Sequence, residues 1–284
     1  MLRNTFCHLP GIGAQTERKL WQAGLTSWDN LLEQSDIAGR YPVRPSCREV
    51  LRESVRRYEQ GDPAYFAALL PPNQRWRLFP DFRGQCAYLD IETTGLGGFG
   101  DHITTVTIYD GGPPRHFIHG ENLNDVPDVL AHYKLLVTYN GATFDLPFLE
   151  RQFRIKIEQA HIDLRYVLKT LGFGGGLKNC ERRLGVERQG MEGIDGAVAV
   201  LLWHEFKRRR DAKALETLLA YNVQDALNLE ILMVEAYNRK LDDTPFANSH
   251  RLPAAAPAAN PFAVDQGVLA RLLRGQPWIL PFAR

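Results

Sequence analysis

The chain has 284 residues, of which 44% are hydrophobic and 24% are charged, and its formal net charge is +1. This composition is typical of a globular protein with a hydrophobic core, and the near-zero charge excludes a global field directed at a polyanionic partner. The four cysteines form no CxxC pair, no apolar run reaches the ~20 residues that span a bilayer, and the N-terminus lacks a signal-peptide stretch. We therefore expect a cytoplasmic protein without disulfides or membrane contact.

Residues 1–70 are expected to form a small all-helical domain. Short amphipathic segments at 14–24, 26–34 and 46–62 are separated by glycine and proline residues. Prolines interrupt residues 71–84, and we predict an extended linker there.

Residues 85–240 are expected to form an α/β domain. Apolar runs predict strands at 86–91, 103–109, 115–120 and 135–140. The segments that follow show mainly helical periodicity, and this order implies a mixed sheet flanked by helices. Residues 241–284 are rich in Pro and Ala, and we predict an exposed tail with at most one short helix.

The stretch "DIETTG" places two acids, Asp90 and Glu92, two positions apart at the end of an apolar run. Because a strand alternates its faces with a period of two, both side chains point the same way. Two carboxylates side by side repel each other, and each is costly to desolvate. A divalent metal between them is the obvious candidate for the charge that would hold them together.

Two later stretches supply further acids. Asp145 follows the strand and turn of "LLVTYNGATFD" and lies near a helix start, where the helix dipole favours a carboxylate. Tyr221 and Asp225 are four apart on a predicted helix and share one face. Neither 85–102 nor 138–150 contains Lys or Arg, so we expect no nearby base to neutralise these acids.

Four carboxylates without interleaved bases suit hard cations with oxygen ligands, namely Mg²⁺ or Mn²⁺. Two such ions can cleave a phosphodiester, since one acidifies a water and the other stabilises the leaving oxygen. Tyr221 would orient the attacking water by a hydrogen bond. With an ordinary pKa of about 10 it is a poor general base at neutral pH.

The motifs "DIETTG", "YNGATFD" and "YNVQD" resemble, in order, the three motifs of the DEDD superfamily, the DnaQ-like 3′–5′ exonucleases with a ribonuclease H-like fold. The YxxxD form of the third motif resembles the DEDDy branch, and the sequence is most similar to its YprB-like group. The resemblance covers about residues 84–240. It implies that Asp90, Glu92, Asp145 and Asp225 are metal ligands and that Tyr221 orients water.

The same resemblance implies contacts with the terminal nucleotide. Thr93 and Gly95 occupy positions where the backbone of the family approaches that nucleotide. Leu96 and Phe144 occupy positions where apolar side chains wedge against the last base. Asn140 matches the polar residue that opens the second motif.

Each of these residues also has a structural interpretation. Asp90 and Glu92 could be solvated residues at a strand end. Tyr221 and Phe144 could be core aromatics, and Asn140 could cap the turn before Asp145. The three motifs in order favour catalysis, because together they are far more specific than any one alone.

The N-terminal stretch "HLPGIG" precedes a predicted basic helix with Arg18 and Lys19. It resembles a helix-hairpin-helix motif, which commonly grips the DNA backbone, and Gly11, Ile12 and Gly13 would line the hairpin. Free backbone N–H groups at a helix start bind phosphate. Such motifs also serve structural roles, so both interpretations stay open.

These features predict a metal-dependent 3′–5′ exonuclease that acts on single-stranded nucleic-acid ends, with DNA favoured over RNA. A non-catalytic nucleic-acid-binding module is the alternative from another class. A structure-specific endonuclease on the same fold is a third possibility. Protein partners and oligomeric state are not indicated by the sequence.

Overall fold

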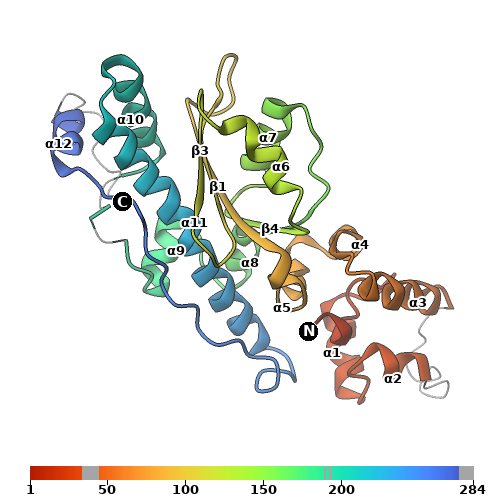
Figure 1. The fold of residues 1–284 in the computed structure, drawn as a ribbon. Coiled ribbons are helices and arrows are strands. Elements are labelled where there is room, and N and C mark those ends of the chain that lie inside the picture. Colours follow the sequence, from red (N-terminus) through yellow and green to blue (C-terminus); the bar gives the residue numbers. More distant parts are fainter. Residues whose placement is uncertain (34–44, 189, 192–193, 275–284) are drawn as a thin grey trace.

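The computed structural model describes residues 1–33, 45–188, 190–191 and 194–274, and its centre is a five-stranded sheet (Figure 1). The strand order is β3-β2-β1-β4-β5. β1 pairs antiparallel with β2 and parallel with β4, so the sheet is mixed as predicted. The strands are β1 (Cys86–Thr93), β2 (Ile103–Tyr109), β3 (Arg115–Ile118), β4 (Leu135–Thr138) and β5 (Ala160–Asp163).

Helices cover both faces of this sheet (Figure 1). One face packs against α6 (Val126–Leu130) and α7 (Asp145–Phe153) in a core of their own. The other face packs against the remaining helices of the domain. These are α8 (Leu164–Thr170), α9 (Leu177–Leu184), α10 (Gly196–Arg209) and the long α11 (Ala212–Leu241).

The side chains of β1 point alternately to the two faces of the sheet, and this alternation decides which face carries Asp90 and Glu92. Leu89 and Ile91 belong to the core under α6 and α7, whereas Tyr88 belongs to the core that contains α11. Asp90 and Glu92 share the parity of Tyr88, so they face α11. The register of β1 against β2 shifts between Glu92 and Thr93, which is a bulge beside the acids.

Strand β5 is not among the predicted strands. Its four residues are all buried, and the polar His161 and Asp163 interrupt its apolar pattern. A short run of this kind gives no clear periodicity, and the helical pattern of α8 begins immediately after it.

The N-terminal region is helical, as expected, and shares one hydrophobic core with the sheet domain. Residues 71–84 do not form the expected extended linker but three short helical turns. Their apolar side chains recur at helical spacing and are buried in the core. Trp76 and Phe79 from this segment pack on Tyr237 of α11. The elements are η1 (Leu2–Asn4), α1 (Ala14–Gln22), α2 (Trp28–Glu33), α3 (Pro45–Glu59), α4 (Pro63–Leu69), η3 (Pro72–Leu78), α5 (Phe79–Phe82) and η4 (Arg83–Gln85).

Residues 251–265 of the C-terminal segment are irregular and exposed or half-buried, as their composition suggested, but hydrogen bonds hold the segment along α11. The Asn238 side chain on α11 exchanges two hydrogen bonds of 2.9 Å with the backbone of Leu252. Further along, Asn260 Nδ2 donates to the carbonyl of Ala220 at 2.7 Å. The segment therefore follows α11 and ends in α12 (Gln266–Arg274), the one short helix predicted there (Figure 1). The division of the chain into domains stays a prediction.

Among the described ranges, no helix is both long enough and apolar enough to span a bilayer.

Candidate active site

Three carboxylates from two elements converge at one end of the sheet. Asp90 and Glu92 come from β1, and Asp225 comes from α11. One oxygen atom of each lies within 4.8 Å of the others. Asp90 is held in place because its Oδ2 accepts a 2.7 Å hydrogen bond from Nδ2 of Asn222, which also faces β1 from α11.

Asp145 lies close to this cluster but outside that set. It is the first residue of α7 and is 4% exposed. Its charge is near enough to contribute to the raised pKa of Asp90 and of Glu92. The four predicted ligands therefore share one electrostatic environment.

A cavity of about 820 Å³ joins these acids to most of the other predicted site residues. Its lining includes all four carboxylates and Tyr221, together with Thr93, Gly95, Leu96, Asn140 and Phe144. The exposed cations Arg165 and Lys169, from α8, also line it. Sequence reasoning missed these two residues, although they lie in the stretch between the second and third motifs.

The loop before α7 has an unusual backbone that Asp163 holds in place. Asn140 has φ 67, a left-handed conformation that Asn tolerates better than most residues. Its N–H donates to Asp163 Oδ1 at 2.7 Å, and the N–H of Ala142 donates to Oδ2 at 3.1 Å. A Cβ at Gly141 would lie 2.1 Å from Thr138 Oγ1, so this turn requires glycine.

Asn140 therefore has a structural part in the turn as well as a place in the cavity. Its Oδ1 accepts hydrogen bonds from Thr143 Oγ1 at 2.9 Å and from Arg165 Nη1. Phe144 is likewise shared between the cavity and a ring contact with Phe148, with centroids 4.9 Å apart.

The loop after β1 presents an apolar side chain at the cavity mouth. Leu96 is 93% exposed, which is unusual for a leucine and leaves it free for contact with a ligand. Thr93 Oγ1 donates to the carbonyl of Gly95 at 2.6 Å. A Cβ at Gly95 would lie 2.5 Å from the Asp101 carboxylate, which shapes the loop by accepting from the N–H groups of Gly97 and Gly98.

Burial and nearby negative charges raise the pKa of Asp90, Glu92 and Asp145, which favours their protonated forms. Burial, followed by the charges of Asp225 and Glu92, raises the pKa of Asp90 well above its ordinary value. Burial and the Asp225 charge do the same to the pKa of Glu92. Burial raises the pKa of Asp145 to about 7.

Tyr221 is 4% exposed and lies in the core under α10 as well as in the cavity wall. Burial and the Asp225 charge raise the pKa of its hydroxyl well above the ordinary value. The hydroxyl is therefore protonated at neutral pH and can donate a hydrogen bond.

The expectation that no base lies near the acids is wrong. Arg188, which follows α9, forms an ion pair with Asp225 through Nη1. It also contacts Glu181 of α9, with an N–O distance of 2.9 Å. The ranges without Lys and Arg are local in sequence, whereas Arg188 reaches the site through the tertiary fold.

The neutralisation is partial. Among the described residues, no ion pair is formed by Asp90, Glu92 or Asp145. Lys178 and Arg188 lie near enough to oppose the rise in the pKa of Glu92, but neither pairs with it. Carboxylates that repel one another and form no ion pair match the preference of Mg²⁺ and Mn²⁺ for oxygen ligands. The residues present therefore fit a divalent metal.

The predicted hairpin residues lie at the start of α1, away from the cavity lining. Gly11 has φ 78, a conformation that favours glycine, and Gly13 is the N-cap residue of α1. Ile12 is buried in the core, while Arg18 and Lys19 are exposed on α1. This arrangement is compatible with both interpretations of the segment.

Comparison with known proteins gives one family match. A family model described as RNase_H_2, RNase_H superfamily, matches residues 87–237. No curated protein matches the chain.

Two solved structures illustrate the structural similarity. A family B DNA polymerase from the hyperthermophilic archaeon Pyrobaculum calidifontis has 15% identity and a TM-score of 0.41, over 59% of this chain and 27% of the polymerase chain. The EXO domain of Nibbler from Aedes aegypti has 12% identity and a TM-score of 0.39, over 59% of this chain and 85% of that domain. This chain thus matches only about a quarter of the polymerase.

Proposed function

The chain belongs to the RNase_H superfamily, and from this premise we propose that it is a metal-dependent 3′–5′ exonuclease of the DEDDy type. The membership agrees with the predicted ribonuclease H-like fold and supports nuclease activity in general. The proposed substrate is the single-stranded 3′ end of a nucleic acid, with DNA favoured over RNA. The proposed cofactors are two Mg²⁺ or Mn²⁺ ions.

The observation that carries this proposal is the convergence of Asp90, Glu92 and Asp225 in one cavity with Tyr221. These residues come from a strand and from a helix more than a hundred positions later, and the oxygen atoms still meet within 4.8 Å. Solvated residues at a strand end would not explain why acids from both elements are half-buried or buried together in one cavity. Asp145 adds a further carboxylate at the wall of the same cavity.

Each residue then has a defined task. Asp90, Glu92 and Asp225, with Asp145, would hold the cations, which when bound supply an acidified water and stabilise the leaving oxygen. Tyr221 would orient the attacking water by donating a hydrogen bond, since its raised pKa keeps the proton in place. Arg165 and Lys169 would hold phosphates, while Leu96 and Phe144 would contact the terminal base.

The test is to incubate 5′-labelled single-stranded DNA and RNA of equal sequence with the protein, with EDTA, Mg²⁺ or Mn²⁺. A 3′–5′ exonuclease gives a ladder that shortens one nucleotide at a time, and only with metal. Asp90→Ala serves as the control for contaminating nucleases. Glu216→Gln, an exposed acid on the same helix as Asp225, is the matched variant that should keep full activity.

A second candidate is a non-catalytic module that binds nucleic-acid ends. The Arg188–Asp225 ion pair favours it, because a neutralised carboxylate is a poorer metal ligand. If saturating Mn²⁺ gives no product from any linear strand while the strand still binds, this candidate replaces the exonuclease. Cleavage of a circular single strand would instead indicate an endonuclease.

A further inference from the structure

Arg188 is the one cation that the described structure brings into direct contact with a predicted metal ligand. Its Nη1 contacts the carboxylates of Asp225 and Glu181, and its side chain is only 11% exposed. The guanidinium carbon also lies 5.3 Å from the centre of the Tyr221 ring. The side chain therefore touches two residues of the proposed catalytic set from within the protein.

The bonding of this guanidinium is incomplete. Its Nε and Nη2 atoms are buried and have no hydrogen-bond partner among the described residues. An arginine that serves only as a structural tie is expected to have its buried donors satisfied. Moving it away from Asp225 consequently breaks fewer hydrogen bonds than moving a fully bonded arginine would.

Glu181 offers this guanidinium a second anchor. It is fully buried on α9, and its Oε1 accepts a 2.8 Å hydrogen bond from Asn228 Nδ2. Both Glu181 oxygens lie 2.9 Å from Arg188 Nη1. Arg188 can therefore lose Asp225 and keep a charged partner.

We propose that Arg188 is the counter-ion of Asp225 in the metal-free protein and competes with the divalent cation for that carboxylate, while Glu181 retains the guanidinium when the cation binds. The inference rests on the proposed function in assigning Asp225 as a metal ligand. A guanidinium and a dication on one carboxylate repel each other in a poorly solvated site. Arg188 thus weakens cation binding, and Glu181 limits this effect by holding Arg188 aside.

The two partners of Arg188 give variants with opposite expected effects. Arg188→Met keeps an apolar stem of similar length and removes the competing charge, so Mn²⁺ should bind about tenfold more tightly or better. Glu181→Gln removes one of the two carboxylates that Arg188 contacts in the described structure and leaves Asp225, so Mn²⁺ should bind more weakly. Arg182→Met is the matched control, because Arg182 is exposed on α9 next to Glu181 and its Nη2 donates to Asn179 Oδ1.

The measurement is isothermal titration of the full chain with MnCl₂ and no nucleic acid, with circular dichroism to verify folding. If Arg188→Met leaves the Glu181 charge unpaired and fails to fold, the double variant Glu181→Gln/Arg188→Met removes both charges, and it should also bind more tightly than wild type.

Unchanged or weaker binding by the folded Arg188 variant, while wild type binds Mn²⁺, overturns the competition and leaves the exonuclease proposal intact. An equal gain in Arg182→Met also overturns it, since net charge would then explain the effect. If neither wild type nor the variants bind Mn²⁺, the metal-dependent function fails and the competition fails with it.

Discussion

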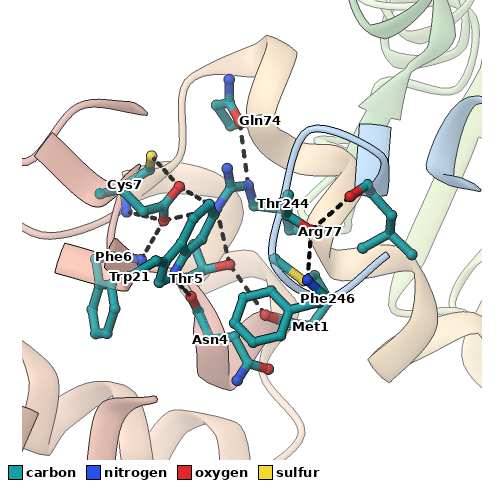
Figure 2. A network of polar contacts seen from close by, with 12 residues as sticks. Met1, Asn4, Thr5, Phe6, Cys7, Trp21, Gln74, Arg77, Thr244 and Phe246 are labelled. Carbon is teal, nitrogen blue, oxygen red and sulfur yellow. Dashed lines mark hydrogen bonds and ion pairs between the residues drawn. The ribbon is translucent and has the colours of Figure 1, made fainter. Parts of the chain in front are cut away.

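Two groups of buried carboxylates in this protein differ in how their charge is balanced. In the N-terminal region, Glu17 of α1 is fully buried, and its carboxylate lies 2.7 Å from Nη1 of Arg77. It also accepts hydrogen bonds from the N–H groups of Phe6 and Cys7, at 2.6 and 3.1 Å. Figure 2 labels Phe6, Cys7 and Arg77 within this network of polar contacts. At the end of the sheet, Asp90 accepts a hydrogen bond from the amide of Asn222 and forms no ion pair among the described residues.

This difference separates an acid that stabilises the fold from acids whose charges the proposed metal ions would balance. The Glu17 charge is compensated within the protein and helps to fasten α1 to η3. Among the described residues, Asp90, Glu92 and Asp145 form no ion pair, and the raised pKa values of all three indicate that their charged forms are costly in this site, although Lys178 and Arg188 partly offset the rise at Glu92. Asp225 lies between these two cases, since Arg188 pairs with it.

The largest expected effect is on the site carboxylate that already has a cationic partner. Asp225→Asn should lower nucleotide release by about 10³-fold or more, because the amide is a much weaker ligand and the cations carry most of the catalysis. The measurement is single-turnover release from a labelled strand at saturating Mn²⁺. Activity within about tenfold of wild type would show that Asp225 is not a ligand.

The structural acid should respond through stability instead. Arg77→Met leaves Glu17 buried without its cation and should cost about 3–5 kcal/mol of unfolding free energy, measured by urea denaturation. The matched control is Arg56→Gln on α3, whose ion pair with Glu53 is exposed, and it should cost about 1 kcal/mol or less. Equal losses in the two variants would remove the distinction between the two groups of acids.

A smaller effect is expected at the tyrosine. Tyr221→Phe would remove the proposed hydrogen bond to the attacking water and leave the carboxylates in place, so the rate should fall by about 10- to 100-fold. Binding of Mn²⁺, followed by titration, should stay unchanged. A loss as large as that of Asp225→Asn would mean that the hydroxyl does more than orient water.

The uncompensated acids also predict a pH dependence of stability. The pKa of Asp145 is about 7 in the folded protein and about 4 in the unfolded chain, so the folded state binds the extra proton between these values. The metal-free protein should therefore lose this stability as the pH rises from about 4 through about 7.

The measurement is the melting temperature across this range in EDTA, for wild type and Asp145→Asn. The variant should lose less stability as the pH rises. Burial lowers the pKa of His8 to about 3 and that of His161 to about 4, so these residues make stability rise with pH. Both proteins contain the two histidines, so their contribution cancels when the slopes are compared. Identical slopes of melting temperature against pH for the two proteins would contradict a raised pKa at Asp145.

The smallest effect is expected at the N-terminal hairpin. Changing Arg18 and Lys19 to Gln should weaken binding of single-stranded DNA only a few-fold and reduce the salt slope by about 1 to 2. Fluorescence anisotropy at several salt concentrations measures both quantities. An unchanged slope would favour the structural role of this segment.

Much of the candidate site follows from local rules. The period of two along β1 puts Asp90 and Glu92 on one face, and the spacing of four along α11 puts Tyr221 beside Asp225. The motifs indicated which strand and which helix should meet, and the cavity brings their side chains together. Arg165 and Lys169 carried no comparable signal, because exposed basic residues on a helix are usually solvated.

Other features depended on contacts between distant segments. The composition of residues 71–84 and of the C-terminal segment suggested irregular structure, yet both pack on α11. Tyr237 contacts the ring of Trp76 from the first segment, and Asn238 donates a hydrogen bond to the backbone of Leu252 in the second. The Asn222–Asp90 hydrogen bond joins residues 132 positions apart, and no local pattern indicates it.

By itself, the sequence determined the mixed α/β architecture, the parity of the acids on β1 and the face of α11 that meets them, because these depend on the periodicity of the backbone. Only the tertiary structure decided which charges are balanced: Arg77 reaches Glu17 and Arg188 reaches Asp225, whereas Asp90 has an amide and no ion pair among the described residues. The physical reason is that the electrostatic energy of a buried charge depends on its distance to every other charge and on its burial, and the fold alone sets both.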